Sequence, residues 1–363
     1  MSPGIVELPG QVAALPEEAR EAFNRIFSVE VAQGILKPPL QMLPWIKQQF
    51  GTIEGVTNQT VVKVTNLFTL ESSVYNTLRA LRPRHYRSYR NDREPVVEDA
   101  EDPFAEPLLY TPEDSFGRVK GRHCITAGNV AKYEGYHGVI IFNEFDPLKF
   151  GYEEVTDYLE TGWKWARRAH GYDPEAQYYL FLWNCTHRAG ASMPHGHAQV
   201  VLGKGRHFAK AEQLRQAAVS YKSKYKREYF DDLFLAHKSL GLGWQHGKSR
   251  IMVYLAPLKL NEVMILSTRG SDGLADAVYR VLECFRDNMQ VKSFNLGIAY
   301  PPFDDSAGWE GFPVVARMLD RGDAHEVSSD IGAMEFYGAN VINNDPFVTA
   351  QHVERVLKRN CDN

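Results

Sequence analysis

The order of hydrophobic patterns along the chain repeats, and this repetition constrains the fold more than any other feature. The first half shows two strand patterns, at residues 60–70 and 136–147, then a helix pattern at 152–171 and further strand patterns at 176–184 and 197–203. The second half shows two strand patterns, a helix pattern and another strand pattern, at residues 250–267, 271–289 and 293–303. Strands that alternate with helices in this order predict an α+β fold, in which antiparallel sheets carry flanking helices.

The repeated order predicts two tandem halves, at residues 1–205 and 206–363. The two halves share no literal sequence repeat, so the division rests on the pattern alone. The helix pattern of the second half places four apolar residues on one side, with Ser271 as the cap, and these residues are Leu274, Val278, Leu282 and Phe285. Two other elements are expected, namely a helix over 16–35 and a final helix over 349–359, and the strand over 60–70 is expected to end near Asn66.

Charge and composition exclude several classes of protein. The chain has 41 basic and 45 acidic residues, and this balance gives no basic excess of the kind that announces nucleic-acid binding. No apolar run approaches the roughly 18 residues that a membrane helix needs, and the first residues lack the pattern of a signal peptide. None of the four cysteines forms a C-x-x-C pair, and their spacing fits no zinc finger. A chain of 363 residues is not expected to need a disulfide framework, which favours a reducing compartment. We therefore expect a cytoplasmic protein without nucleic-acid or membrane partners.

The stretch GASMPHGHAQVVLG, at residues 190–203, concentrates the candidate chemistry. Because side chains alternate along a strand, His195, His197 and Gln199 are expected to point to the same face. Three polar side chains on one face of an apolar strand would be costly to bury without partners. A polar ligand is therefore expected opposite them.

An imidazole can serve as a metal ligand, a general base or a nucleophile. The metal role is weakly supported, because no carboxylate follows His197 closely and no cysteine pair accompanies it. The nucleophilic role fits better: a histidine nitrogen that attacks phosphorus forms a phosphoramidate and divides one transfer into two steps. Gln199 can donate to a phosphate oxygen, the turn at Gly190 offers backbone N–H groups, and Lys204 is a candidate to neutralise phosphate charge.

The stretch NCTHRAGASMPHGHAQ resembles the histidine-triad superfamily, in the branch that carries His-x-His-x-Gln. This branch includes galactose-1-phosphate uridylyltransferase and the diadenosine tetraphosphate phosphorylases, also known as ATP adenylyltransferases. Asn184 lies eleven residues before His195 and Ser192 lies three before it, as in the pattern of the branch. The resemblance extends weakly over about residues 55–360 and implies a fold of two histidine-triad-like halves.

The resemblance also implies roles for individual residues. His197 would be the nucleophile that becomes nucleotidylated, Gln199 would hold the phosphoryl oxygens, and His195 would support the site. Ser192 and Asn184 would line the path of the phosphates. The strand that ends at Asn66 resembles the nucleoside-pocket strand of the branch, which makes Asn66 a candidate substrate contact.

The resemblance leaves the metal content open. The uridylyltransferase binds a structural metal with help from the residue that matches His195, but this chain lacks the accompanying cysteine pair and has Phe145 in place of a metal histidine. The chemistry itself is expected to need no cofactor, and a divalent metal remains possible.

The expected function is a nucleotidyltransferase or phosphorylase with a nucleotide or nucleotide-sugar substrate and a phosphate or phosphorylated metabolite as acceptor. Two alternatives stay open: a nucleotide hydrolase, in which water replaces the acceptor, and a non-catalytic nucleotide-binding protein. A third alternative is an oxygenase with a histidine-bound metal. Members of the branch often dimerise, so a homodimer is possible. The polar, proline-rich stretch at 83–117 predicts a long surface loop and hints at a specialised substrate.

Overall fold

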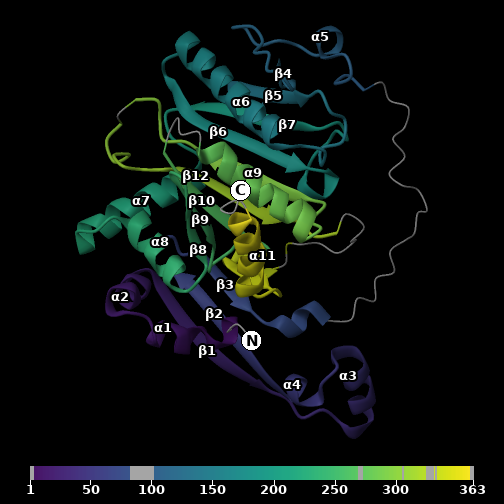
Figure 1. Ribbon diagram of the computed structural model, residues 1–363, viewed down its shortest axis with the longest axis vertical. Helices are drawn as coiled ribbons and strands as arrows, with labels where there is room; N and C mark the ends of the chain where they lie inside the picture. The colour runs from purple at the N-terminus through teal and green to yellow at the C-terminus, as the bar shows by residue number, and fades with distance from the viewer. Residues whose placement is uncertain are drawn as a thin grey trace.

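The structure is a computed structural model of the chain. It describes residues 4–81, 102–268, 273–304, 306–323, 331 and 333–359. Within these ranges, two sheets and their covering helices form the fold that Figure 1 shows. No helix in these ranges is both long and apolar enough to cross a bilayer. The α+β class predicted from the repeated pattern is confirmed.

The larger sheet has nine strands among the described residues and runs through both halves of the chain. In spatial order its strands are β4 (Cys124–Gly128), β5 (Tyr136–Phe142), β7 (His197–Lys204), β6 (Ala176–Cys185), β11 (Phe294–Ala299), β12 (Val314–Asp320), β10 (Val263–Ser267), β9 (Ser249–Val253) and β8 (Gly243–His246). All of its pairings are antiparallel. The two halves meet where β6 pairs with β11. The division at residue 205 stays a prediction.

The chain order within this sheet repeats. Strands β4 and β5, helix α6 (Tyr152–Tyr172) and strands β6 and β7 form the first unit; β9, β10, helix α9 (Gly273–Glu283), β11 and β12 form the second. The two helices lie side by side on one face of the sheet, where the rings of Tyr152 and Tyr279 are in contact. β12 therefore corresponds to β7, because each is the last strand of its unit.

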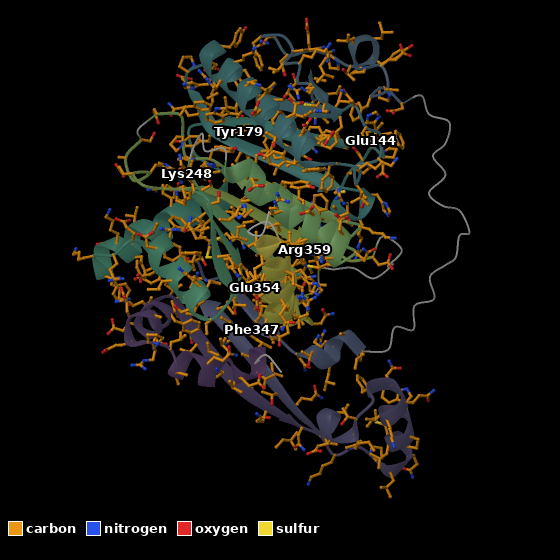
Figure 2. The ribbon with its side chains drawn as sticks, viewed as in Figure 1. Glu144, Tyr179, Lys248, Phe347, Glu354 and Arg359 are labelled. Carbon is orange, nitrogen blue, oxygen red and sulfur yellow. The ribbon has the colours of Figure 1, made fainter. Side chains whose placement is uncertain are left out.

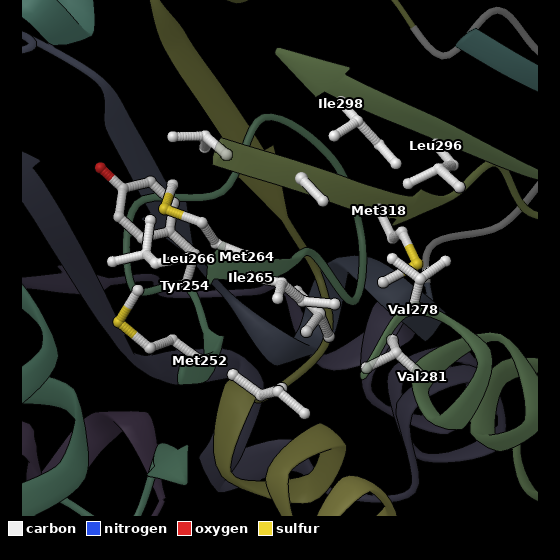
Figure 3. Packing of buried hydrophobic residues seen from close by; sticks show 14 of the residues in the cluster. Met252, Tyr254, Met264, Ile265, Leu266, Val278, Val281, Leu296, Ile298 and Met318 are labelled. Atoms are coloured by element: carbon white, nitrogen blue, oxygen red, sulfur yellow. The ribbon is translucent and has the colours of Figure 1, made fainter. Parts of the chain in front are cut away.

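One face of this sheet packs against α6 and α9. In the first unit the rings of Phe142 and Tyr158 stack between β5 and α6. In the second unit Ile265 and Met318 lie towards Val278 of α9, as Figure 3 shows. The four residues predicted to face inward from α9 and its extension are buried, namely Leu274, Val278, Leu282 and Phe285. Ser271 lies outside the described residues.

The smaller sheet packs on the second unit. In spatial order its strands are β1 (Phe27–Ile35), β2 (Asn58–Asn66), β3 (Ser72–Tyr75) and β13 (Ala339–Ile342). The β3–β13 pairing is parallel, which departs from the otherwise antiparallel arrangement. Tyr75 of β3 donates a hydrogen bond to the carbonyl of Leu255, and Ser73 donates one to the carbonyl of Pro257.

The remaining helices surround these sheets (Figures 1 and 2). They are α1 (Leu8–Ala13), α2 (Glu17–Ile26), α3 (Leu43–Phe50), α4 (Ile53–Thr57), α5 (Pro107–Tyr110), α7 (Ala209–Tyr225), α8 (Tyr229–Ser239), α10 (Ala333–Phe336) and α11 (Pro346–Lys358). The last of these confirms the helix expected near the end of the chain.

The helix predicted over residues 16–35 is wrong in its second part. The helix α2 ends at Ile26, and the nine residues from Phe27 to Ile35 form β1. β1 pairs with β2 along its whole length. An apolar periodicity at the start of the segment indicated a helix, but long-range pairing with a β-branched strand decided the conformation of the rest.

Candidate active site

The candidate site lies on the face of the larger sheet that is turned away from α6. His197 is the first residue of β7 and Gln199 is the third, so both side chains point to this face. Ala198 and Val200 point to the other face and belong to the hydrophobic core that includes α6. The alternation predicted for His197 and Gln199 is therefore confirmed, whereas His195 precedes the strand.

The surroundings of His197 select one tautomer of its ring. Nδ1 lies 2.8 Å from the carbonyl oxygen of His195. A carbonyl oxygen only accepts, so Nδ1 carries the proton and Nε2 keeps its lone pair. Burial is the main cause that lowers the pKa of His197, a residue that is only 7% exposed. The ring is therefore neutral near pH 7, with one nitrogen available to react.

His195 is fixed by two acceptors. Its Nδ1 lies 2.6 Å from Oδ2 of Asp102, and its Nε2 lies 2.9 Å from the carbonyl oxygen of Phe142. A carboxylate oxygen and a backbone carbonyl oxygen therefore face the two ring nitrogens and fix the orientation of the ring. The fixed ring holds in place the backbone carbonyl of the same residue, which selects the tautomer of His197.

Gln199 is oriented by a second histidine, His137 of β5. The backbone N–H of Tyr133 lies 3.0 Å from Nδ1 of His137, so that nitrogen accepts and Nε2 carries the proton. This Nε2 lies 2.9 Å from Oε1 of Gln199 and donates to it. Asn129 Nδ2 lies 3.1 Å from the same Nε2, which in this tautomer has no lone pair to accept from it. The amide oxygen of Gln199 is thus occupied, and its amide nitrogen is directed elsewhere.

A pocket of about 300 Å³ opens beside His197 and Gln199. Its walls are largely apolar and include Phe104, Tyr110 and Val139. The Phe104 ring packs edge-on against the rings of both His197 and His195, with centroids 5.4 and 5.9 Å apart. An apolar pocket with a few polar groups at one end is the usual form of a small-molecule site.

Two further predicted residues lie near His197. Ser192 lines the pocket. Asn184, the ninth residue of β6, lies two positions beyond Leu182, which pairs with Gln199, so its side chain shares the face that carries His197. Ser192 therefore lines the pocket and Asn184 shares the face of His197, while the roles that the motif implies for them stay predictions.

Gly190 ends the short 3-10 helix His187–Ala189, which follows β6. Its φ of +97° is in the left-handed region that favours glycine, so the residue serves the turn. Its backbone N–H donates to the carbonyl of His187, 3.0 Å away. That N–H is consequently engaged within the protein, and the geometry gives Gly190 a role in the turn between the two strands.

Two other predicted residues are not brought to the pocket. Lys204 lies at the opposite end of β7 from His197, about 23 Å away at the rise of a strand, and forms ion pairs with Asp173 and Glu175. Asn66 is fully buried, and its Nδ2 donates to the hydroxyls of Tyr229 and Tyr254. The structure thus gives both residues other partners.

Sequence reasoning missed the contribution of the segment at 102–112. Asp102, Phe104 and Tyr110 lie more than 80 positions before His195, in a stretch predicted only as a surface loop. Asn129, directly after β4, was in contrast a candidate from the sequence, together with His137, and it lines the pocket. No local sequence pattern indicated that Asp102 is the carboxylate partner of His195.

The metal that the resemblance raises does not fit at His195. Both nitrogens of that ring are engaged by protein acceptors, and the Phe145 ring lies edge-on with its centroid 5.3 Å away. In the part of the chain that the structure describes, no group of three His, Cys, Asp or Glu residues is placed to hold a metal ion.

Three solved structures share the architecture of this chain. An ADP-glucose phosphorylase from Arabidopsis thaliana with bound ADP-glucose superposes with a TM-score of 0.60 at 11% identity, over 80% of this chain and 97% of that chain. A uridylyltransferase gives a TM-score of 0.57 at 15% identity, over 81% and 98%. A GalT-like protein from Arabidopsis thaliana gives 0.56 at 13% identity, over 70% and 91%. These matches confirm the fold of the uridylyltransferase branch that the histidine motif implied.

No family model matches the sequence. No curated protein matches it either. At 11–15% identity the structural likeness shows the fold, and the chemistry must be argued from the site.

Proposed function

We propose that this chain is a nucleotidyltransferase or phosphorylase that works through a covalent nucleotidyl group on His197. One observation carries the proposal: the His195 carbonyl holds the proton on Nδ1 of His197, which leaves Nε2 as a neutral nucleophile in a side chain that lines the pocket. The fold supports the same reading, because solved relatives in fold include a uridylyltransferase and an ADP-glucose phosphorylase.

The proposed reaction has two displacements at one phosphorus atom. In the first, Nε2 of His197 forms a bond to the α-phosphorus, and the bond to the leaving phosphate oxygen breaks with its electron pair. In the second, an oxygen of the acceptor phosphate forms a bond to phosphorus, and the phosphorus–nitrogen bond breaks as its electron pair returns to Nε2. The proton stays on Nδ1 throughout, where the His195 carbonyl stabilises the charge that the ring acquires.

Charge increases on the non-bridging phosphoryl oxygens during each displacement. The amide nitrogen of Gln199 is directed by His137, and the Ser192 hydroxyl lines the same pocket, so both are suited to donate to these oxygens. Donors fixed before the reaction begins stabilise such charge without reorganisation. No redox cofactor takes part in these steps, and we assign the apolar walls near Phe104 to the nucleoside.

Intact-mass spectrometry tests this proposal. The protein is incubated separately with ADP-glucose, UDP-glucose and diadenosine tetraphosphate, without an acceptor. We expect one of these donors to add the mass of one nucleotidyl group, and we expect the His197→Ala variant to remain unmodified. Full turnover by His197→Ala with every donor would exclude the mechanism.

The fate of the adduct separates the alternatives. Discharge by added phosphate, with formation of a nucleoside diphosphate, indicates a phosphorylase; discharge by a sugar phosphate indicates a transferase. Discharge in buffer alone indicates a hydrolase. Nucleotide binding without any adduct would indicate a non-catalytic binding protein.

A further inference from the structure

The second half of the chain is connected to the candidate site by a hydrogen bond from Asn295, on β11, to Asn184, on β6. The side chain of Asn184, on β6, points to the same face of the sheet as His197, whereas the pocket lies on the other side of β7, over β4 and β5. Its Oδ1 accepts a hydrogen bond from Nδ2 of Asn295 on β11, 2.7 Å away. Its own Nδ2 has no hydrogen-bond partner among the residues that the structure describes, which leaves two N–H bonds available to a ligand.

Three contacts fix the orientation of the Asn295 amide. Nη1 of Arg321 lies 2.6 Å from Oδ1 of Asn295, and a guanidinium only donates. Nδ2 of Asn295 lies 2.8 Å from the carbonyl oxygen of Ala189, which only accepts. Asn295 therefore donates its N–H to Asn184, and Asn184 accepts this hydrogen bond with Oδ1.

The resulting chain of donors runs in one direction, from Arg321 through Asn295 to Asn184. Asn295 pairs directly with Asn184 across β6 and β11, where the two halves join. Arg321 follows the end of β12. An amide held in this way cannot exchange its oxygen and nitrogen without the loss of a hydrogen bond, which costs roughly 1–3 kcal/mol when a group is left unpaired.

We propose that Asn295 and Arg321 are positioning residues, which align the Asn184 amide so that its N–H groups face the phosphates on the leaving and acceptor side of His197. The inference rests on the proposed function and deepens it. The first half supplies the nucleophile and the pocket, and the second half supplies the orientation of the donor on the far side of the phosphorus. Neither the histidine motif nor any local pattern indicated Asn295 or Arg321.

Asn295→Asp is the most direct test, since aspartate has nearly the same shape. An aspartate at this position still accepts from Arg321 but cannot donate to Asn184, so the Asn184 amide turns its oxygen towards the ligand. We expect the rate of adduct formation on His197 to fall by roughly 10- to 100-fold, in line with the loss of one preorganised donor. The nucleoside pocket is untouched, so the affinity for the free nucleoside should not change.

A double-mutant cycle separates alignment from a merely structural role. Asn184→Ala should slow adduct formation about as much as Asn295→Asp, and the two changes together should be no worse than Asn184→Ala alone. Arg321→Met should show the same dependence on Asn184, and Arg321→Lys, which keeps a donor, should recover much of the rate. Gln245→Ala, at an exposed position on the distant β8, is the control for amide loss and should react like the unchanged protein.

The possible results are distinct. If the unchanged protein forms no adduct with any donor, the proposed function fails and this inference fails with it. If the unchanged protein forms the adduct and Asn295→Asp forms it equally fast, or if the effects of Asn184→Ala and Asn295→Asp multiply, only the alignment is overturned. A lower melting temperature in Asn295→Asp with an unchanged rate would likewise overturn it and leave the function in place.

Discussion

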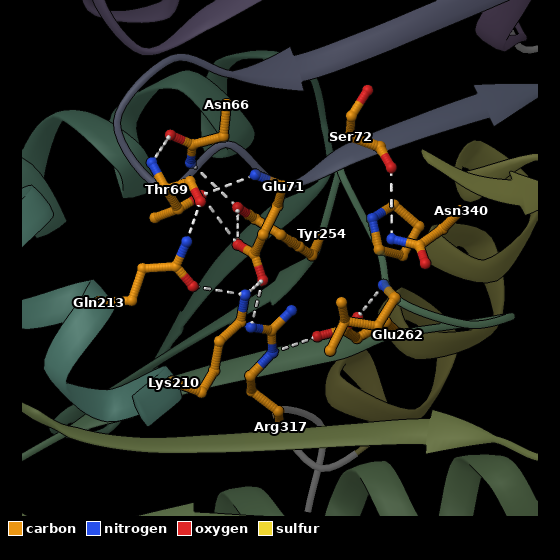
Figure 4. Close-up of polar contacts among 12 residues, drawn as sticks. Asn66, Thr69, Glu71, Ser72, Lys210, Gln213, Tyr254, Glu262, Arg317 and Asn340 are labelled. Atoms are coloured by element: carbon orange, nitrogen blue, oxygen red, sulfur yellow. Dashed lines mark hydrogen bonds and ion pairs between the residues drawn. The ribbon is translucent and has the colours of Figure 1, made fainter. Parts of the chain in front are cut away.

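The two units of the larger sheet use the same face in opposite ways. In the first unit this face carries His197 and Gln199 on β7 and borders an open pocket. In the second unit the corresponding strand, β12, carries Arg317 on this face. Nη1 of Arg317 pairs with Glu71 at 2.6 Å, and its Nε pairs with Glu262. Figure 4 shows the network that closes this region.

Charge balance explains the closed face. Burial alone would raise the pKa of Glu71, but Arg317 and Lys210 lower it to about 2. Burial opposes the charge of Arg317 as well, but Glu262 and Glu71 raise its pKa. A face whose buried charges are paired inside the protein stabilises the fold. A face that leaves an amide nitrogen and an imidazole lone pair free is available to a ligand.

The largest expected effect is on the open face. His197→Gly removes the proposed nucleophile, so nucleotidyl transfer should fall at least 10³-fold, measured by initial rates with the donor found by mass spectrometry. The free energy of unfolding should change far less, since the ring packs against a pocket. Substantial transfer by the folded variant would contradict the assignment of this face.

On the closed face, loss of one partner should destabilise the protein. Arg317→Met leaves Glu71 and Glu262 buried without their shared cation, and we expect a loss of about 3–5 kcal/mol in denaturant unfolding. Arg250→Met, which breaks a more exposed pair with Asp231, is the matched control and should cost about 1 kcal/mol or less. Equal losses of unfolding free energy in the two variants would show that the buried network stabilises the protein no more than an exposed ion pair does.

Acid should weaken the closed face through Glu71. A lowered pKa stabilises the folded state above the ordinary value near 4.5, and this contribution disappears as the pH falls towards 2. Glu71→Gln should therefore cost about 3 kcal/mol at pH 7, and its unfolding free energy should converge with that of the unchanged protein near pH 2. A difference independent of pH would indicate lost packing instead.

Asp102→Asn should show a smaller effect on the open face. Asparagine can still accept from His195 but offers a neutral amide oxygen in place of the carboxylate, so the ring of His195 and the carbonyl that orients His197 are held less firmly. We expect adduct formation to slow about tenfold, by about 1.4 kcal/mol. Glu106→Gln, an exposed charge loss on the same segment, is the control and should have no effect.

The smallest expected effect is that of mild acid on His197. Because burial lowers the pKa of this ring, it should remain neutral when the pH reaches the ordinary histidine value of 6.5. Adduct formation should therefore differ by less than twofold between pH 8 and pH 6.5, measured by quenched mass spectrometry. A decline with a midpoint at or above 6.5 would show that another group controls the reaction.

Some features of the fold were predictable because they depend on local periodicity. The amphipathic pattern of 152–171 matches α6 within one residue at its end, and the buried side of α9 matches the predicted residues. The segment 27–35 was not predictable in the same way, because its strand state depends on β2. Likewise, Asn66 and Lys204 carried suitable chemistry but found partners within the protein.

By itself, the sequence determined which residues alternate on β7, and therefore that an imidazole and an amide share one face. Tertiary structure decided which distant groups meet them: Asp102 at His195, His137 at Gln199, and Asn295 at Asn184. The physical reason is that side-chain direction follows from the two-residue repeat of a strand, whereas hydrogen-bond partners across strands depend on the order and register of the whole sheet.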